Sequence, residues 1–391
     1  MLICSNPISG QHGGDYLYGI ITTKSGDQYR GYMRWGGEEV SWTDIFNSTK
    51  TSRQLKEGQS SKGFSWKNMD WDFNSIWRDN RRSSSRSFAC QFGDIAFLHN
   101  RGKDRVDIEL KNGAIIQVDG GSNDIGARIE LADYELGTIK MEWKRVENVE
   151  FFQAPEEEEP EFGDLLYGKV QSRRGGSFEG FIKWDNDERV AYDILDGDSR
   201  NGEQKIPFGN IKSITKDEDG SIVDFPSGRS LFLDGSNDVS NGNRGVIVYV
   251  DQLGSVEIPW RYFESVTFTP TNFNKSYENY PNPQILQGEV RMFNGTIHEG
   301  QIIFDMDEFW DMEMLDGNDD YVEYQIPFRN IGKIIPKNRS YSLVVLRNGQ
   351  EILLGDTQDV SSNNDGVLIL GQGSSKPVNV DWDDIDEIVF N

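Results

Sequence analysis

The sequence carries three copies of one motif, and a long internal repeat constrains a fold more strongly than any local pattern. The second and third copies align at an offset of 120 residues up to a shared Ile-Pro-Phe motif. In the second copy the shared residues are Gly168, Gly175, Gly180, Asp185, Glu188, Leu195, Asp196, Gly197 and Ile206-Pro207-Phe208. Their counterparts are Gly288, Gly295, Gly300, Asp305, Glu308, Leu315, Asp316, Gly317 and Ile326-Pro327-Phe328. Each copy should therefore be one structural unit.

The first copy has the same motif with an insertion. It starts at an offset of 149 residues from the second, where Gly31, Trp35, Glu39 and Asp44 match Gly180, Trp184, Glu188 and Asp193. By Phe92-Gly93-Asp94-Ile95, which matches Phe208-Gly209-Asn210-Ile211, the offset has fallen to 116. The difference of 33 residues is an insertion that only the first copy carries, between about Phe46 and Phe88.

Each copy divides again into two halves with similar ends. In the second copy the first half closes with Ile206-Pro207-Phe208 and the second half with Ile258-Pro259-Trp260. Short apolar runs such as Leu343–Leu346 alternate with Asn-Gly turns, the strongest local signal for a β-hairpin. We therefore predict an all-β protein of three tandem repeats. Each repeat would hold two small five-stranded barrels, which gives six half-units, and the first would add a short helical insertion.

The closing motif Ile206-Pro207-Phe208-Gly209-Asn210-Ile211 resembles the end of the Src-homology-three (SH3) barrel. There a proline turn and one 3₁₀ turn lead into the last strand. The Gly-rich opening of each copy is similar to that of Sm-like small barrels. The resemblance covers most of the chain as architecture and implies a fold only. The aromatic ligand-binding signature of eukaryotic SH3 domains is not recognisable in the sequence, so proline-peptide binding is not implied.

The boundaries follow from the copies and two linkers. The predicted segments are 1–17 (N-terminal), 18–152 (repeat 1, with its insertion at about 50–87), 153–162 (acidic linker), 163–268 (repeat 2), 269–285 (linker) and 286–391 (repeat 3). Within the second linker, Tyr277 and Tyr280 are expected to pack it onto a barrel.

The charge of the chain excludes several functions. A net charge of −25 repels phosphate backbones and anionic lipid, so nucleic-acid and membrane-surface binding are disfavoured. The sequence has no apolar run long enough to span a membrane. The three His residues are scattered, and no nucleophile elbow or phosphate-binding loop is recognisable. We expect a protein that is not an enzyme and has no cofactor. Whether Cys4 and Cys90, the only cysteines, form a disulfide stays open.

Acidic turns are the candidates for cation binding. Asp185 with Glu188, and Asp305 with Glu308, could form a cation or sugar site. The alternative is a turn that serves the fold, which recurrence in every copy favours. Further weak calcium candidates are Asp196, Asp198, Asp316 and Asp319. None follows the twelve-residue calcium loop, so we predict turns and no metal. A loop aspartate shared by the copies, at Asp124, Asp238 and Asp359, is expected to bond nearby backbone N–H groups.

The insertion is the one segment that breaks the repeat. Between Lys50 and Ser87 it holds nine Lys/Arg against four Asp/Glu. Its apolar spacing predicts a short helix that begins after Ser65. The candidate partner-binding residues are Trp66, Trp71, Phe73, Trp77, Arg78, Arg81, Arg82 and Arg86. Trp and Arg dominate interface hot spots, which favours a protein–protein or self-assembly contact. The alternative is an intramolecular clasp over a barrel edge.

The sequence thus indicates a non-enzymatic binding or scaffold protein whose partner is another protein or another copy of the chain. The alternative is a bacterial cell-envelope module that binds glycan or peptidoglycan through acidic and Trp-bearing loops. The compartment stays open: periplasmic or extracellular if a leader ending near Cys4 was removed, cytoplasmic otherwise.

Overall fold

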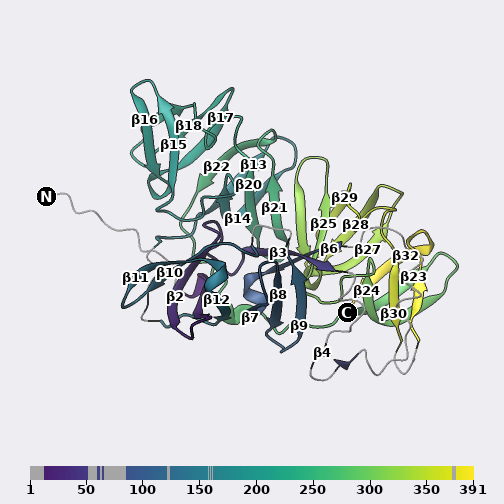
Figure 1. The fold of residues 1–391 in the computed structure, drawn as a ribbon. Coiled ribbons are helices and arrows are strands. Elements are labelled where there is room, and N and C mark those ends of the chain that lie inside the picture. Colours follow the sequence, from purple (N-terminus) through teal and green to yellow (C-terminus); the bar gives the residue numbers. More distant parts are fainter. Residues whose placement is uncertain are drawn as a thin grey trace.

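The computed structural model describes residues 13–51, 60–61, 64–65, 85–120, 124–156, 158, 160, 162–371 and 376–391. This part of the chain is all-β, as predicted (Figure 1). Its helical elements are 3₁₀ turns of three residues: η1 (Gly13–Asp15), η3 (Phe92–Asp94), η4 (Trp143–Arg145), η5 (Phe208–Asn210), η6 (Tyr277–Asn279), η7 (Phe328–Asn330) and η8 (Trp382–Asp384). None of the helices in the described ranges has the length and apolar character needed to cross a membrane.

The strands are grouped by the sequence copy in which they lie, called repeats 1, 2 and 3. Repeat 1 contains β1 (Tyr18–Thr23), β2 (Gln28–Trp35), β3 (Ile45–Thr51), β6 (Ser85–Gln91), β7 (Ile95–Asn100), β8 (Arg105–Leu110), β9 (Ile115–Asp119), β10 (Ile129–Asp133), β11 (Gly137–Met141) and β12 (Val146–Phe151). Two short strands, β4 (Ser60–Ser61) and β5 (Phe64–Ser65), lie between β3 and β6.

Repeats 2 and 3 have ten strands each in the described part. Repeat 2 contains β13 (Tyr167–Ser172), β14 (Ser177–Trp184), β15 (Ile194–Ser199), β16 (Gly202–Pro207), β17 (Ser213–Asp217), β18 (Gly220–Asp224), β19 (Ser230–Leu233), β20 (Val246–Val250), β21 (Gly254–Ile258) and β22 (Phe263–Phe268). Repeat 3 contains β23 (Gln287–Met292), β24 (Ile297–Phe304), β25 (Met314–Asn318), β26 (Glu323–Pro327), β27 (Ile331–Pro336), β28 (Tyr341–Leu346), β29 (Glu351–Gly355), β30 (Val367–Leu370), β31 (Val378–Val380) and β32 (Ile385–Phe390).

The sequence predicts that each consecutive half of a repeat forms its own barrel. In the structure, strands of one half instead pair with strands of the other half. In repeat 2, the first two strands, β13 and β14, pair with the last strands: β14 with β20, β20 with β21, and β13 with β22. The middle strands form a second group, in which β15 pairs with β16, β17 with β18 and β18 with β19. The two halves thus exchange strands, and the equivalent pairings occur in repeats 1 and 3.

The glycines that recur in the sequence lie at the exchange. Gly31, Gly180 and Gly300 each face a carbonyl oxygen of the strand that the other half contributes. A Cβ there would lie 1.8 Å from Ala132 O, 1.8 Å from Tyr249 O and 2.0 Å from Leu370 O, respectively. Contact that close is impossible for any side chain, so only glycine lets these strands pair. The shared glycines therefore serve the fold.

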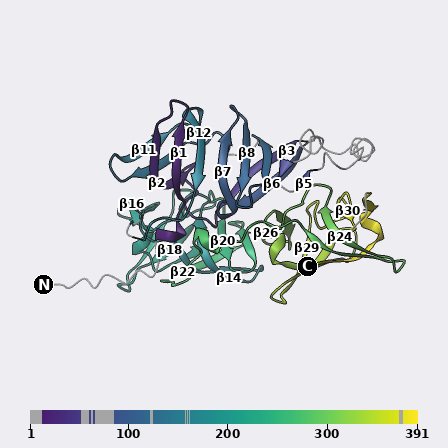
Figure 2. The same ribbon diagram turned by 90° about the horizontal axis from the view of Figure 1, so that it is seen from below.

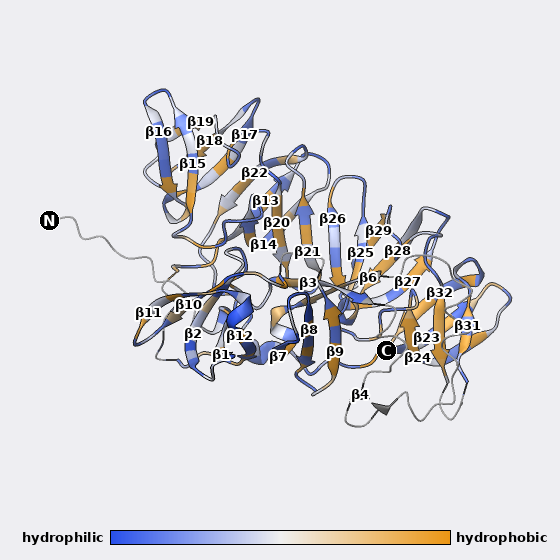
Figure 3. Cartoon of the chain, viewed as in Figure 1, coloured by the Kyte–Doolittle hydropathy of each residue, from blue (hydrophilic) through white to orange (hydrophobic). Residues whose placement is uncertain are grey.

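Repeats 2 and 3 lie side by side, and repeat 1 packs against both from one side (Figure 2). Strands β21 and β26 pair across the boundary between repeats 2 and 3. The core of repeat 1 extends into its neighbours, because Phe181, Tyr249, Phe309, Trp310 and Met312 belong to the same buried cluster as Trp35 and Trp42. The apolar segments lie mainly on strands, although strands such as β8 and β16 also carry many polar residues (Figure 3). The three repeats therefore share buried surface.

The second linker packs onto repeat 1, as its tyrosines predicted. The Tyr280 hydroxyl donates a hydrogen bond to Trp42 O at 2.9 Å, and the Tyr277 hydroxyl to Ile95 O at 3.0 Å. The Tyr280 ring lies where the side chain of residue 93 would be, since a Cβ on Gly93 would approach it to 2.4 Å. This contact ties the start of repeat 3 to repeat 1.

Candidate functional site

A cavity of about 630 Å³ lies where the three repeats meet. Repeat 1 lines it with residues between Glu39 and Asn47, after strand β2. Repeat 2 contributes residues of β14, β20 and β21, and repeat 3 contributes β25, β26 and the loop at Asp356 and Thr357. No single repeat encloses this space, so the cavity depends on how the repeats are held together.

A buried ion pair fixes the repeat 1 wall to repeat 2. One carboxylate oxygen of Asp44 accepts the backbone N–H groups of Val40 and Ser41 at 2.8 Å each. The other accepts Arg189 Nε at 2.9 Å, and the side chains are 4% and 2% exposed. Burial opposes ionisation of Asp44, but Arg189, Lys183 and the two N–H groups hold its pKa below the ordinary value. Removing either partner would leave an uncompensated buried charge.

Two further ion pairs make this interface reciprocal. Arg34 of repeat 1 bonds Asp193 of repeat 2 at 2.7 Å, and Lys183 of repeat 2 lies 3.3 Å from Glu39 of repeat 1. Arg34 and Lys183 occupy equivalent positions in the two repeats. Burial raises the pKa of Glu39 to about 8, and Lys183 opposes that shift. The sequence analysis predicted no role for Lys183 or Arg189. A signal was available for Lys183, because Arg34 is a basic residue at the equivalent position of repeat 1.

The part of the cavity lining where repeats 2 and 3 join is acidic. Glu257 of β21 and Glu323 of β26 face each other in the strand pair that joins repeats 2 and 3. Burial, and secondly the charge of Glu323, raise the pKa of Glu257. The cavity is lined by six carboxylates against Lys183 and Arg189: Glu39, Asp44, Glu257, Asp316, Glu323 and Asp356. Such a surface favours a cationic or neutral ligand over an anionic one.

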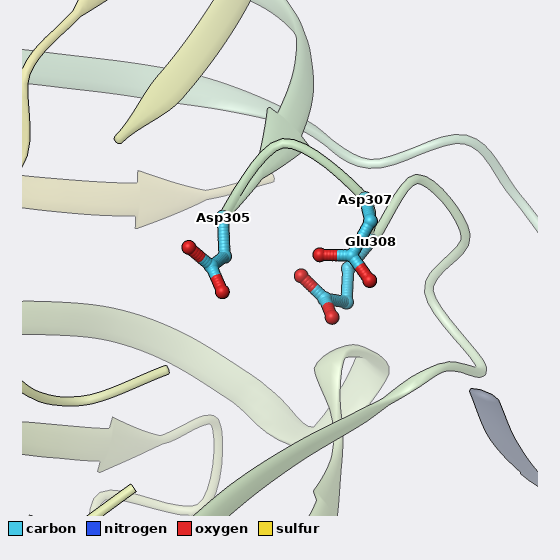
Figure 4. Close-up of side chains that lie close together, drawn as sticks. All are labelled: Asp305, Asp307 and Glu308. Atoms are coloured by element: carbon cyan, nitrogen blue, oxygen red, sulfur yellow. The ribbon is translucent and has the colours of Figure 1, made fainter. Parts of the chain in front are cut away.

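A second feature lies in the turn after β24. Asp305, Asp307 and Glu308 are all buried, and one carboxylate oxygen from each lies within 4.8 Å of the others (Figure 4). The turn reverses through Asp305 and Met306, whose φ angles are 45° and 66°. Repeat 1 has Gly36 and Gly37 at these positions, at 67° and 95°. Repeat 2 has the same left-handed turn at Asp185 and Asn186, with φ angles of 47° and 60°.

Repeat 1 supplies a cation beside this cluster. The Lys50 ammonium donates to Asp307 O at 2.7 Å and pairs with the Glu313 carboxylate, with side chains 5% and 3% exposed. Burial raises the pKa of Glu308 well above its ordinary value, Asp307, Asp359 and Asp305 raise it further, and Lys50 opposes them. The arrangement concentrates carboxylates in a place where water cannot fully solvate them.

The equivalent turn of repeat 2 is neutralised from within. Arg244 Nε lies 3.4 Å from an Asp185 carboxylate oxygen, and the same guanidinium pairs with Asp187. Arg244 precedes β20. The residue at its position in repeat 3, between Asn364 and Gly366, is Asp365. The two turns therefore share a backbone and differ in the charge placed next to it.

The loop aspartates have a different role from the local turn expected for them. Asp124, Asp238 and Asp359 accept the backbone N–H groups of Asn47 (2.6 Å), Asp196 (2.7 Å) and Asp316 (2.7 Å), respectively. These donors are 42 or more residues away in sequence. Each aspartate thus connects the two strand groups of its repeat, and a sequence pattern cannot reveal a partner so distant.

The structure does not bring the four weak calcium candidates together. Asp196 and Asp198 lie on β15, Asp316 lies on β25, and Asp319 follows it. Asp319 accepts the N–H groups of Tyr321 and Val322 at 3.1 and 3.0 Å, and Gln325 donates to Asp316 at 3.1 Å. The carboxylates of Asp316 and Asp319 are thus engaged in their own hairpin. Asp307 and Asp365, which the sequence reading passed over, lie at the more concentrated cluster.

The predicted partner-binding residues from Trp66 to Arg82, with their predicted helix, lie outside the described residues. Arg86 belongs to β6, but its side chain is also outside them. The insertion can still be placed: β3 and β6 pair up to Thr51 and Ser85, so residues 52–84 connect the two strands of one hairpin. Cys90 is a buried free thiol, and Cys4 lies outside the described part.

Comparison with known proteins identifies no relative. No protein-family model, no curated protein and no solved structure matches the chain.

Proposed function

We propose that each five-stranded group is a small barrel of the SH3-like or Sm-like kind, with two such barrels in each repeat. The order of strands supports this. In repeat 2, the group β21-β20-β14-β13-β22 follows the order 4-3-2-1-5 along the two contributing half-units. A 3₁₀ turn precedes the fifth strand in five of the six half-units, at η3, η4, η5, η7 and η8. The exchange of strands keeps this order, because the first half supplies strands 1 and 2 of the group and the second half supplies strands 3, 4 and 5.

The protein itself is, in this proposal, a non-enzymatic binding protein for which the barrels are the scaffold. The cavity between the repeats carries the argument. Its acidic wall at Glu257 and Glu323 suits a cationic group, and the ion pairs Arg189–Asp44 and Lys183–Glu39 hold the walls in place. Lysine and arginine side chains of a partner protein are ligands of this chemistry. The partner would therefore present a basic segment.

Calorimetric titration with short lysine- and arginine-rich peptides tests this function. We expect saturable binding that weakens with added salt, since the attraction is electrostatic. The double variant Glu257→Gln/Glu323→Gln should lose it. A matched double variant of exposed carboxylates, Glu147→Gln/Glu264→Gln, should keep it. Binding by the cavity variant equal to wild type, or no saturable binding to the wild type, contradicts the proposal.

The basic, Trp-rich insertion remains a proposed second contact with a partner or another copy. Because Lys50 is buried against Glu313, a deletion that tests it must spare both strands of the hairpin. Replacing residues 52–84 with Asn-Gly does so, and it mimics the two-residue turn Arg200-Asn201 between Ser199 and Gly202 in repeat 2. Loss of oligomers in light scattering supports the contact. An unchanged monomer that melts earlier supports the clasp.

A glycan ligand is the second candidate. It is favoured by the aromatic side chains of Phe181, Tyr249 and Tyr324, which line the cavity beside the side-chain amides of Asn47 and Gln325. A saccharide is neutral and uses apolar faces and hydrogen bonds together, as ligand pockets commonly do. A glycan array, with the Glu257→Gln/Glu323→Gln variant beside the wild type, distinguishes it: glycan binding should not depend on salt.

A further inference from the structure

We propose that the buried carboxylates of Asp305, Asp307 and Glu308 in repeat 3 form a binding site for a divalent cation, and that this cation is Ca²⁺. The site is separate from the cavity residues on which the proposed binding function rests.

The spacing of the oxygen atoms matches one shared ion. Calcium binds oxygen at 2.3–2.6 Å, so two ligands on opposite sides of it are separated by about 4.6–5.2 Å. One oxygen from each of the three carboxylates lies within 4.8 Å of the others. Separations within this bound allow one oxygen from each carboxylate to contact the same ion. In Figure 4 the carboxylates of Asp307 and Glu308 lie together and that of Asp305 stands opposite them.

Glu308 supplies a second reason for a ligand at this position. Its side chain lies in the cluster and is 8% exposed, and its Oε2 atom has no hydrogen-bond partner among the described residues. A buried carboxylate oxygen without a partner costs free energy that native structures seldom leave unrecovered. A bound cation would satisfy this oxygen directly. The equivalent Glu188 Oε2 of repeat 2 also lacks a hydrogen-bond partner among the described residues, so the two turns differ in the charges beside them and not in this oxygen.

The comparison with repeat 2 shows what is missing in repeat 3. In repeat 2 the turn carboxylates receive a cation from Arg244, next to the loop asparagine Asn243. In repeat 3 Asp365 follows the equivalent Asn364, and its backbone N–H still bonds Asp305. An arginine has thus been exchanged for a further acidic residue on an otherwise equivalent framework. Lys50 contributes one positive charge to a region that also contains Glu313 and Asp359.

The ligand set selects among cations. Carboxylate oxygens are hard ligands, which suit calcium and magnesium and not the softer transition metals. Magnesium requires near-octahedral oxygens at 2.0–2.1 Å, so oxygens on opposite sides of it would be about 4.2 Å apart. Calcium accepts less regular geometry from carboxylate oxygens, so three carboxylates from one short turn suit calcium better than magnesium.

Calorimetric titration of the EDTA-treated full chain with CaCl₂, and separately with MgCl₂, tests the site. We expect one Ca²⁺ per chain, a Tm that rises with Ca²⁺ concentration, and weaker binding of Mg²⁺. Glu308→Gln should weaken Ca²⁺ binding by about 10-fold or more, since even residues that only support a metal ligand are worth that much. The matched variant Glu188→Gln in repeat 2 should bind as the wild type does.

Three results would overturn the inference. These are a Tm that Ca²⁺ leaves unchanged, tighter binding of Mg²⁺ than of Ca²⁺, and unaltered Ca²⁺ affinity in Glu308→Gln. Should Glu308→Gln fail to fold, Asp305→Asn removes a different ligand and the same comparison applies. Retained Ca²⁺ affinity in that variant likewise rejects the site. Basic-peptide binding measured on the same variants separates this inference from the cavity function, which neither substitution touches.

Discussion

Repeats 2 and 3 contain the same turn and treat its charge in different ways. In both, the first aspartate of the turn accepts a backbone N–H from the loop before the next strand, at Arg244 and Asp365. In both, the loop asparagine donates to the carbonyl of Asp238 or Asp359 at 3.0 Å. Repeat 2 then neutralises the turn with its own half-exposed arginine, whereas repeat 3 relies on Lys50 of a distant repeat. Shared residues thus build the framework, and one unshared position sets its chemistry.

The largest loss of stability should come from removing Lys50, the repeat 1 side chain that supplies a positive charge to repeat 3. Lys50→Met leaves Glu313 buried and unpaired, which should lower the free energy of unfolding by about 3–5 kcal/mol. Arg244→Met in repeat 2 removes a 46% exposed side chain and should cost no more than about 1 kcal/mol. Urea unfolding of both variants measures the difference. Equal losses would show that the two turns do not differ in how they depend on their cations.

Exchanging Arg244 and Asp365 should transfer the Ca²⁺-dependent gain in Tm from repeat 3 to repeat 2. Asp365→Arg removes a carboxylate and places a guanidinium beside the repeat 3 turn. The guanidinium repels Ca²⁺, so Ca²⁺ binding should weaken by about 10-fold or more. Arg244→Asp, made in the Glu308→Gln background, should restore part of the Ca²⁺-induced rise in Tm from repeat 2. Differential scanning fluorimetry with and without Ca²⁺ reads out both. If Asp365→Arg keeps its full Ca²⁺ response, Asp365 does not determine the site.

The pH dependence should distinguish Asp185 and Asp187, which pair with Arg244, from Glu188 of the same turn. Burial, and secondly Asp238, raise the pKa of Glu188 from 4.5 to about 8. The folded state therefore binds more protons than the unfolded state across that range, and stability falls as pH rises from about 4.5 to about 8. Glu188→Gln should flatten this decline in urea unfolding at pH 5, 6, 7 and 8. The exposed control Glu147→Gln should retain it; an unchanged slope in Glu188→Gln would contradict the assignment.

The all-β class was predictable because local patterns indicate it: short apolar runs and Asn-Gly turns. The exchange of strands was not. Strands such as β14 and β20 present the same pattern whether they pair within a half-unit or between halves, and the backbone hydrogen bonds are equally satisfied. The insertion could be bracketed between Phe46 and Phe88 from the offsets alone, and the pairing of Thr51 with Ser85 fixes where it leaves the sheet.

The sites depended on long-range packing in the same way. The sequence identified Asp305 and Glu308 as a recurring acidic turn that serves the fold. Nothing local indicates that Lys50, 257 residues away, contacts that turn. The sequence predicted no role for Asp365, because its charge becomes informative only when it is compared with Arg244 at the equivalent position of repeat 2. The cavity was invisible for the same reason: Glu257 and Glu323 belong to different repeats and meet only across paired strands.

The smallest effect concerns that pairing, where repeats 2 and 3 join. Glu257 and Glu323 are directly opposite each other, and like charges in this position destabilise a strand pair. Glu257→Gln keeps an acceptor oxygen for the Asn186 side chain and removes one charge, so the free energy of unfolding should rise by about 0.2–1 kcal/mol. Urea unfolding at pH 8, where more of the Glu257 population is ionised, gives the larger gain. The same variant should bind basic peptides more weakly. A gain in stability together with weaker binding would show that the repulsion between Glu257 and Glu323 costs stability and serves ligand binding. A variant that is less stable than wild type would instead assign Glu257 a structural role at the join.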